Sequence, residues 1–338
     1  MPRRASPWML VWIAAVGLAA CGGEAPAPRA AAADAPTAGD EAAPEPAAPV
    51  GPPRSYVADE DTIVVRVDMA RVRASSISSD IGSLVRSYPT WQRLLGRSGI
   101  DPVRDFDRVL VSAPTAITDR ATMVIHHRLS GADVREAVLN MAVAEGEQPA
   151  WREVGGFDVV DWPAPTDPPR VVILSGPSEF VVTTPDDLER VIAVASDHRA
   201  RRRGDETVEP ALVLEDGTVA TVVAEEMSEY GRSRMRHAPE AFEVVLRDDA
   251  EAEGHLRLRA RGTYADADAA SAAARYYVTQ RNEYAGNMMV RAVGLDRPLR
   301  EATIEAEGNR LDVTAAFTEE EIQRVLGLVA LGGLGAGG

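Results

Sequence analysis

The sequence predicts an α+β fold built from two related halves, each with the order β-α-β-β-α-β-β-α and a ferredoxin-like antiparallel sheet with helices on one face. From Tyr56 onward, short runs of β-branched residues alternate with stretches of helical character. Two segments also recur: 184–192 aligns without gaps on 318–326, and 128–133 aligns on 261–266. The nearly equal offsets, 134 and 133 residues, indicate an internal duplication.

The first half opens with a strand at 62–68, in which Ile63, Val65 and Val67 share one face. It closes with a helix from Thr184, where Thr is the N-cap, Pro185 takes the first position and two acids fill the first turn. The elements between them are a helix over 77–95 interrupted by Pro89, strands at 108–112 and 122–128, a helix from 130 to about 141, a strand at 157–161, and a hairpin of 170–174 and 180–183.

The second half repeats this order with a shorter first helix. Its predicted elements are strands at 218–225, 242–246 and 256–261, helices at 228–236 and from 267 to about 293, a hairpin of 301–306 and 311–315, and a helix from 318. In 256–261 the leucines point one way and the arginines the other, and 301–307 alternates in the same manner. This alternation predicts that one face of the sheet is buried and the other is solvated.

The composition of the chain limits which partners it can bind and how its fold can be stabilised. The chain has 338 residues, one cysteine and a formal net charge of -16, and its 36 basic residues are all arginine. A protein with this negative charge repels nucleic acid and anionic lipid head groups. We therefore expect no nucleic-acid partner. A single cysteine cannot form an intramolecular disulfide, so the core alone must stabilise the fold.

The N-terminus reads as an export signal. Arg3 and Arg4 precede an uncharged apolar stretch over 8–17, and Leu18-Ala19-Ala20-Cys21 follows. This tetrapeptide resembles the lipobox of bacterial lipoproteins at every position. The resemblance implies a lipid on the Cys21 thiol, cleavage before Cys21 and acylation of the new N-terminus. Gly22, in place of Asp, favours the outer membrane by the same resemblance. The alternatives are an ordinary signal peptide or a retained N-terminal anchor.

Residues 22–53 consist almost entirely of Ala, Pro, Gly, Asp and Glu, which predicts a disordered tether. Such a tether would reach roughly 30 Å as a coil and about 100 Å as extended polyproline II. The predicted organisation is a signal peptide (1–20), Cys21 and its tether (21–55), a first repeat (56–200), a charged connector (201–208), a second repeat (209–333) and a glycine-rich tail (334–338).

The chain carries no catalytic or metal motif that can be named. It has no HExxH, EF-hand or Gly-x-Ser-x-Gly pattern. His126 and His127 are adjacent, but neighbours on a strand point to opposite faces and do not readily chelate one ion. The runs of acidic residues are explained by loops or by helix N-termini, where the helix dipole favours negative charge. We therefore expect no cofactor, no metal and no catalytic residue.

Two features could serve binding. Arg257, Arg259 and Arg261 form a stripe that either meets an acidic partner or, as we favour, pairs across strands with nearby glutamates (Glu243, Glu301, Glu305 and Glu307). The last helix carries apolar residues at helical spacing, continuing to Leu331 and Leu334, which favours core packing and leaves room for a partner surface.

The sequence thus predicts a lipid-anchored cell-envelope protein, held in the membrane through Cys21, whose ectodomain is a non-catalytic binding or structural module with an envelope protein as one candidate partner. One alternative is a periplasmic carrier or assembly factor for an apolar ligand or an envelope protein. A carrier requires a cavity lined by aliphatic side chains. The other alternative is a hydrolase, which requires polar groups that converge in a cleft with shifted pKa values.

Overall fold

The computed structural model describes residues 52–75, 78–87, 96–115, 120–162, 169–202, 209–227, 232, 235–248 and 255–325. The strands are β1 (Ile63–Asp68), β2 (Phe106–Ala113), β3 (Thr122–His127), β4 (Arg152–Val154), β5 (Phe157–Asp161), β6 (Val171–Gly176), β7 (Glu179–Thr183), β8 (Thr218–Ala224), β9 (Ala241–Asp248), β10 (His255–Thr263), β11 (Thr303–Glu307) and β12 (Arg310–Thr318). The helices are α2 (Met69–Ala74), α3 (Ser78–Ser87), α5 (Pro102–Asp105), α6 (Gly131–Ala144), α7 (Leu188–Arg201), α9 (Ala267–Gly286), α10 (Met288–Ala292) and α11 (Asp296–Glu301), with short 3₁₀ turns η1 (Pro185–Asp187) and η2 (Pro210–Leu212).

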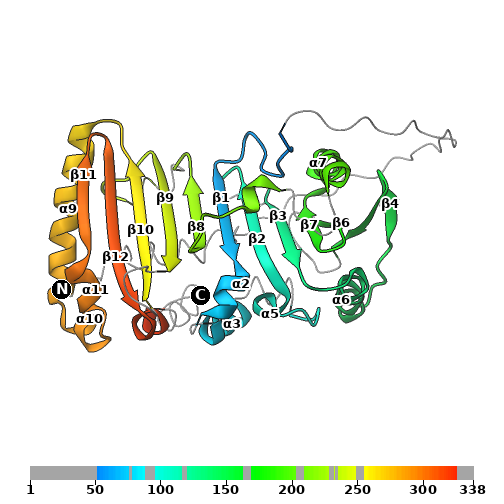
Figure 1. Ribbon diagram of the computed structural model, residues 1–338, viewed down its shortest axis with the longest axis horizontal. Coiled ribbons are helices and arrows are strands. Elements are labelled where there is room, and N and C mark those ends of the chain that lie inside the picture. Colours follow the sequence, from blue (N-terminus) through cyan, green and yellow to red (C-terminus); the bar gives the residue numbers. More distant parts are fainter. Residues whose placement is uncertain are drawn as a thin grey trace.

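The twelve strands form one antiparallel sheet, in the order β11-β12-β10-β9-β8-β1-β2-β3-β7-β6-β5-β4 (Figure 1). The predicted α+β class is therefore confirmed, and each strand expected from the sequence is present. The helices flank this sheet, with α9 at one end of the molecule and α6 and α7 at the other. A further helix begins at Glu319 and continues through Val325, the last described residue.

The two halves meet at the ladder between β1 and β8. In this antiparallel pair Ile63 lies opposite Ala224 and Val67 lies opposite Ala220. From this ladder outward, the strand order is β1-β2-β3-β7-β6 on one side and β8-β9-β10-β12-β11 on the other, and β5 and β4 extend the first side. The halves therefore share one continuous sheet instead of forming two.

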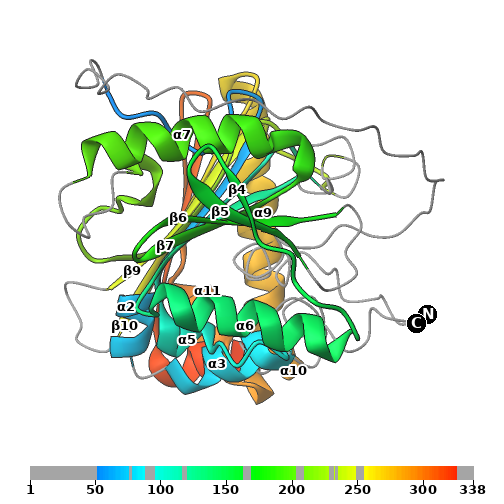
Figure 2. The ribbon, with the colours of Figure 1, turned by 90° about the vertical axis from the view of Figure 1, so that its right-hand side faces the viewer.

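In the first half, helices cover both faces of the sheet. Val124 belongs to the core cluster beneath α7, whereas its neighbour Ile125 belongs to the cluster beneath α6. Val181 and Val182 divide in the same way, because successive strand residues point to opposite faces. Figure 2 shows α7 and α6 on opposite sides of β5, β6 and β7.

The prediction that helices lie on one face is therefore wrong for the first half. The reason is visible in the strands: β7 is buried at every position, and β6 begins with three consecutive buried residues. Continuous apolar runs of this kind are typical of strands that are covered on both faces. The alternation seen in the second half does not extend to these strands.

In the second half, α9 lies against one face and the arginine stripe lies on the other. Leu258 and Ala260 of β10 line a space on the α9 side, so Arg257, Arg259 and Arg261 point away from it. The N-terminal part of α9 packs closely, because Ala270 and Ala273 bring only a methyl group to the interface and are fully buried; their neighbours in the cluster include Tyr264 and Leu311.

The predicted helix from 267 to about 293 is two helices. Helix α9 ends at Gly286, and Asn287 adopts a non-helical backbone with φ -71° and ψ 130°. The Asn287 side chain then accepts a hydrogen bond from the Met289 N–H and caps α10. Asparagine is a favoured N-cap, so it both ends one helix and starts the next. Of the other predicted helices, 77–95 corresponds to α3 over 78–87, and most of 228–236 lies outside the described residues.

Replacing Ala270 by leucine should destabilise the fold, since it would force three extra carbons between α9 and the sheet. We expect the free energy of unfolding to fall by about 1–3 kcal/mol, as is usual for overpacked cores. Ala267→Leu, at an exposed position of the same helix, should change it by no more than about 0.5 kcal/mol. Urea unfolding measures both, and equal effects of the two substitutions would contradict the close packing of α9.

Candidate functional site

An apolar pocket of about 180 Å³ lies between α9 and the sheet in the second half. Its floor is the sheet surface, formed by Leu258 of β10 and by Val313 and Phe317 of β12. Its walls come from α9, α11 and the segments that flank α11: Tyr276, Tyr277, Tyr284, Leu295, Pro298, Leu299 and Ala302. The volume is below the 300–1,000 Å³ of pockets for drug-sized ligands, so it suits a narrow ligand.

The sequence of α9 explains why the pocket forms. The first half of the helix is rich in alanine and lies close to the sheet, as at Ala270 and Ala273. The second half carries Tyr276, Tyr277 and Tyr284, whose rings line the pocket. Large rings hold the helix away from the strands where small side chains would let it collapse onto them. The space between helix and sheet therefore opens toward the C-terminal end of α9.

The polar groups around the pocket are few. The Tyr277 hydroxyl donates a hydrogen bond to the His237 carbonyl, 3.1 Å away, and burial raises the pKa of Tyr277 to about 12. Among the described lining residues, Gln280 and Arg281 are the polar ones besides the tyrosines, and none is acidic. Apolar walls with a small number of polar groups are the usual composition of a ligand site.

Arg281 is held in a defined position at this pocket. Its Nη1 donates to the Ala302 carbonyl at 2.8 Å. Its Nε and Nη2 donate to the Asn282 Oδ1 at 3.2 and 3.0 Å. Within the part of the chain that the structure describes, Arg281 forms no ion pair with a carboxylate. The pocket surface is almost wholly apolar, so Arg281 contributes to it at the edge, and no other described lining residue carries a charged side chain.

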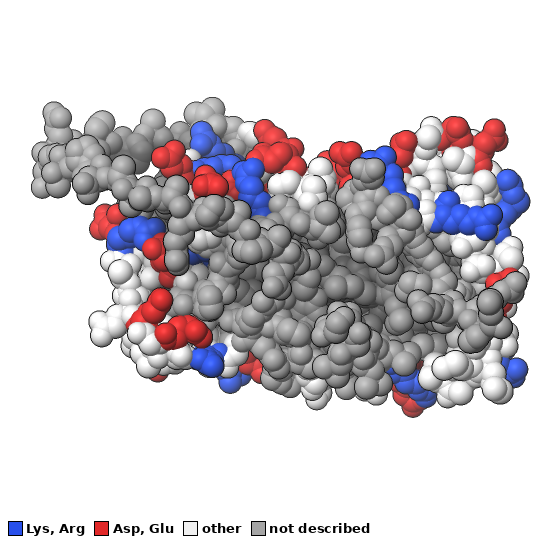
Figure 3. Space-filling model, turned by 180° about the vertical axis from the view of Figure 1, so that it is seen from behind, with Lys and Arg blue, Asp and Glu red and all other residues white. Residues whose placement is uncertain are grey.

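The polar side chains among the described lining residues are those of tyrosine, glutamine and arginine. Histidine, serine, cysteine and carboxylate side chains, the commonest nucleophiles and general bases, are not among these described residues. Across the described residues, no group of three or more His, Cys, Asp and Glu side chains comes together as a metal site would require. Seen from behind, the end of the molecule formed by α9 carries basic and acidic side chains among uncharged surface (Figure 3).

The arginine stripe lies on the opposite face of the sheet and is paired internally. Asp312 of β12 lies opposite Arg261 and accepts hydrogen bonds from Arg261 Nε at 3.1 Å and Arg259 Nε at 3.0 Å. On its other side Arg261 lies opposite Glu243, and Asp312 lies opposite Glu305. Strands β9, β10, β12 and β11 therefore carry one row of charged side chains across this face, which are Glu243, Arg261, Asp312 and Glu305 in that order.

The predicted partners of the stripe differ from the observed ones in part. Glu243 and Glu305 lie in the same row as Arg261, but Glu301 pairs with Arg297 of α11 and Glu307 lies opposite Arg310. Asp312 was not among the predicted partners of the stripe, because only the strand register places it beside Arg261. Arg257, the third member, lies opposite Arg247 and not opposite a carboxylate. Ion pairs this exposed contribute about 0–1 kcal/mol each.

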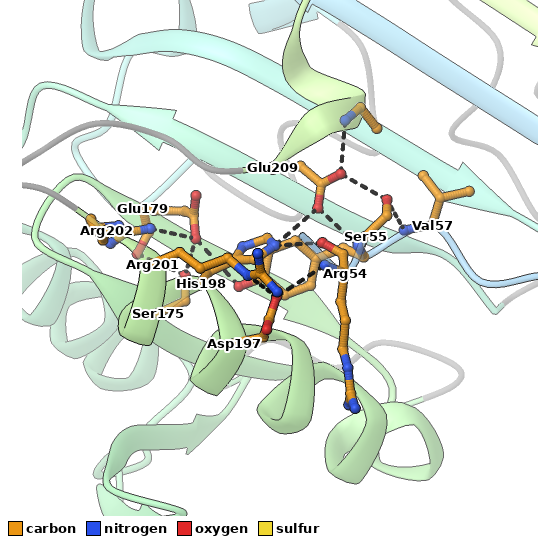
Figure 4. A network of polar contacts seen from close by, with 12 residues as sticks. Arg54, Ser55, Val57, Ser175, Glu179, Asp197, His198, Arg201, Arg202 and Glu209 are labelled. Carbon is orange, nitrogen blue, oxygen red and sulfur yellow. Dashed lines mark hydrogen bonds and ion pairs between the residues drawn. The ribbon is translucent and has the colours of Figure 1, made fainter. Parts of the chain in front are cut away.

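A buried polar network fastens the start of the folded chain (Figure 4). Glu209, fully buried, accepts hydrogen bonds from the Tyr56 N–H at 2.8 Å and the Ser55 hydroxyl at 2.7 Å. His198 of α7, also fully buried, donates from Nε2 to the Arg54 carbonyl at 2.6 Å, and Asp197 accepts from the Arg54 N–H at 3.0 Å. Arg54 and Ser55, which the sequence assigned to the tether, are therefore held by the fold.

The same network continues to Glu179, which contacts Ser175, Arg202 and the Tyr56 hydroxyl. Burial raises the pKa of the Tyr56 hydroxyl far above its usual value, and it also raises the pKa of the Glu209 carboxyl. Shifted pKa values often mark active sites, but these groups are enclosed in the core between α7 and the sheet, with no described cleft beside them. Their contacts serve to position the chain.

The two adjacent histidines do not act together. His127 is 2% exposed and packs against the Phe180 ring, whose centroid is 5.3 Å away, and its Nδ1 lies 3.1 Å from the Leu129 carbonyl. His126 points the other way and contacts the Ser178 hydroxyl at 3.2 Å. The remaining sites named from the sequence, Cys21 and the apolar residues Leu331 and Leu334, lie outside the described residues.

Among the described residues, no helix is both long enough and apolar enough to cross a membrane. No family model matches the chain, and no curated protein sequence matches it. One similar solved structure is that of TP0453 ("Structure of crystal form I of TP0453"), with 10% sequence identity and a TM-score of 0.41. The alignment covers 80% of this chain and 94% of the other.

Stability should depend on pH through His127. Burial lowers its pKa from 6.5 to about 4, so the folded state keeps the imidazole neutral while the unfolded state takes up a proton below pH 6.5. The free energy of unfolding should therefore decrease as the pH falls through this window, by about 2 kcal/mol between pH 7 and pH 5. His127→Gln should remove this contribution, measured as urea unfolding at the two pH values. His126→Gln is the matched control, and a loss of the pH dependence in the control alone would contradict the assignment.

Proposed function

We propose that the chain is a lipid-anchored cell-envelope protein whose ectodomain binds an apolar ligand in the α9 pocket without changing it chemically. The pocket is the observation that carries this proposal, because its surface is almost wholly apolar and its described lining residues include no histidine, serine, cysteine or carboxylate. The carrier alternative requires such a cavity, whereas a purely structural module would be expected to fill it with side chains.

The N-terminal residues support an anchored role. Arg3, Arg4, the apolar stretch and Leu18-Ala19-Ala20-Cys21 have the order of a lipoprotein signal. The chain then needs a firm point where the tether joins the body, and the buried contacts of Arg54 and Ser55 provide one. Two or more acyl chains on Cys21 would give stable attachment, whereas one gives only marginal binding. Gly22 after Cys21 favours the outer membrane.

We also infer that the two halves arose by duplication of one ferredoxin-like unit. The matching segments support this, since 128–133 and 261–266 both connect the third strand of a half to its helix, α6 or α9. Likewise 184–192 and 318–326 both follow the last strand of a half, β7 or β12. The equal strand orders on the two sides of the β1–β8 ladder are a third, independent support.

The arginine stripe adds little support to an acidic protein partner. Arg259 and Arg261 share the Asp312 carboxylate, so a partner would compete with an ion pair already made. The pocket is the better candidate for the binding activity.

Cys21→Ser should abolish lipid attachment. The variant should leave the membrane fraction or remain as uncleaved precursor, because no thiol is left to receive the lipid. Detergent phase separation with Triton X-114 and mass measurement of the mature protein check both outcomes. If the variant still fractionates as a mature, detergent-phase protein, the lipobox interpretation is wrong.

Ala315→Phe should block the pocket. Ala315 lies on its wall, and a benzyl group there would displace about three methylene groups of a bound chain. At about 0.8 kcal/mol per methylene, the loss is about 2 kcal/mol, or roughly thirtyfold in affinity. The measurement uses the full chain in phosphatidylcholine vesicles and a photoactivatable hexadecanol that bears a diazirine. The readout is the probe concentration that gives half-maximal labelling of α9.

Ala316→Phe is the control for this experiment, since it places the same ring one residue further along, on the other face of β12. This variant should be labelled like the unmodified chain. Absence of α9 labelling in the unmodified chain, or equal labelling of the two variants, would contradict ligand binding in the pocket.

A further inference from the structure

We propose that the ligand of the α9 pocket is a single acyl chain with an anionic head group, and that the head group pairs with Arg281. This inference rests on the proposed function and adds the chemical class of the ligand. Three observations carry it: the charge of the wall, the surroundings of Arg281 and the size of the space.

The charge of the wall is opposite to that of the protein. The chain has a formal net charge of -16, yet Arg281 is the one charged residue among the described residues that line the pocket. An anionic ligand would be repelled by most of the surface and attracted only where positive charge is concentrated. The pocket therefore offers an anion a favourable local environment next to an apolar one.

The surroundings of Arg281 differ from those of the arginines nearby. Arg297 pairs with Glu301 and Glu321, Arg300 pairs with Asp296, and Arg324 pairs with Glu320. Arg281 has a carbonyl and a side-chain amide as its partners, and within the described residues no carboxylate reaches it. Those contacts orient the guanidinium without neutralising its charge.

Arg281 is half-buried as a residue, and a guanidinium beside apolar surface is a suitable site for an anion. Removing a charge from water is costly unless an opposite charge meets it, so Arg281 has more to gain from an anion than an exposed arginine has. A hydrogen bond between two charged groups is also about twice as strong as a neutral one. A carboxylate or phosphate at Arg281 would supply the charged partner that the described residues do not supply.

The size of the space suits a narrow ligand such as part of an acyl chain. A volume of about 180 Å³ holds about six groups of the size of water or methylene, at roughly 30 Å³ each. Leu258, Val313 and Phe317 form the floor of an apolar slot, the tyrosines form its wall, and Arg281 lies at its edge. An acyl chain that lies in the slot with its head at Arg281 satisfies both parts of the site.

The test compares an acid with its alcohol. Diazirine-bearing palmitic acid and the corresponding hexadecanol are added to the full chain in phosphatidylcholine vesicles, in mildly alkaline buffer where the acid is ionised. The readout is the probe concentration for half-maximal labelling of peptides that cover α9 and α11. We expect the acid to label these peptides at a roughly tenfold lower concentration than the alcohol, as one charge-assisted contact predicts.

Arg281→Gln should abolish this preference and leave labelling by the alcohol in place. Arg275→Gln, at an exposed position of the same helix, is the matched control and should keep the preference. Equal labelling by acid and alcohol in the unmodified chain, or an intact preference in Arg281→Gln, would overturn the inference while the proposed function stands. Absence of labelling by either probe would instead remove the proposed function.

A third probe separates two sources of the same chemistry. Phosphatidylglycerol with a diazirine on one acyl chain presents the anion and the chain within a bilayer lipid. Labelling of α9 by this lipid as well as by palmitic acid supports the inference and identifies the bilayer as a source of the ligand. Labelling by palmitic acid alone supports the inference with a free fatty acid as the ligand.

Discussion

The antiparallel ladder between β1 and β8 is the interaction on which the rest of the structure depends. Without it, each half would end at an open strand edge with unpaired backbone groups, which proteins generally avoid. The pairing of Ile63 with Ala224 and of Val67 with Ala220 closes both edges at once. The strands of one half follow β1 on one side of this ladder, and the strands of the other half follow β8 on the other side, so each half extends the sheet outward from the ladder. The ladder therefore makes the sheet continuous. It also places α9 and its pocket at one end of the molecule, and α6, α7 and the contacts of Arg54 and Ser55 at the other.

The five strands nearest the β1–β8 ladder follow the same order in both halves, but the two halves bury their sheets differently. In the first, β6 and β7 are apolar on both faces, and α6 and α7 cover one face each. In the second, β10 alternates leucine with arginine, so only one face is apolar and α9 covers it incompletely. The first half is therefore a closed core that also holds Arg54, Ser55 and Tyr56 through Glu209 and His198, whereas the second has an apolar pocket between α9 and the sheet.

Much of the fold could be predicted, and much less of the site. Strand positions followed from β-branched runs, and the start of α6 from Ser130, whose hydroxyl caps the helix. The pocket could not be predicted, because it needs the distance between α9 and the sheet, and that distance is set by which of the α9 alanines and tyrosines face the strands. Asp312 was missed for a similar reason: only the register between β10 and β12 places it beside Arg259 and Arg261.

The sequence by itself determined the α+β class, the strands other than β4 and the acidic charge, and it supplied the resemblance of Leu18-Ala19-Ala20-Cys21 to a lipobox, since these depend on local pattern and composition. Only the tertiary structure decided that the halves share one sheet, that the first half is covered on both faces and that Arg281 lies on an apolar wall without a carboxylate partner in the described chain. Local patterns fix which face of an element is apolar. What covers that face depends on contacts between residues far apart in the chain, and these exist only once it is folded.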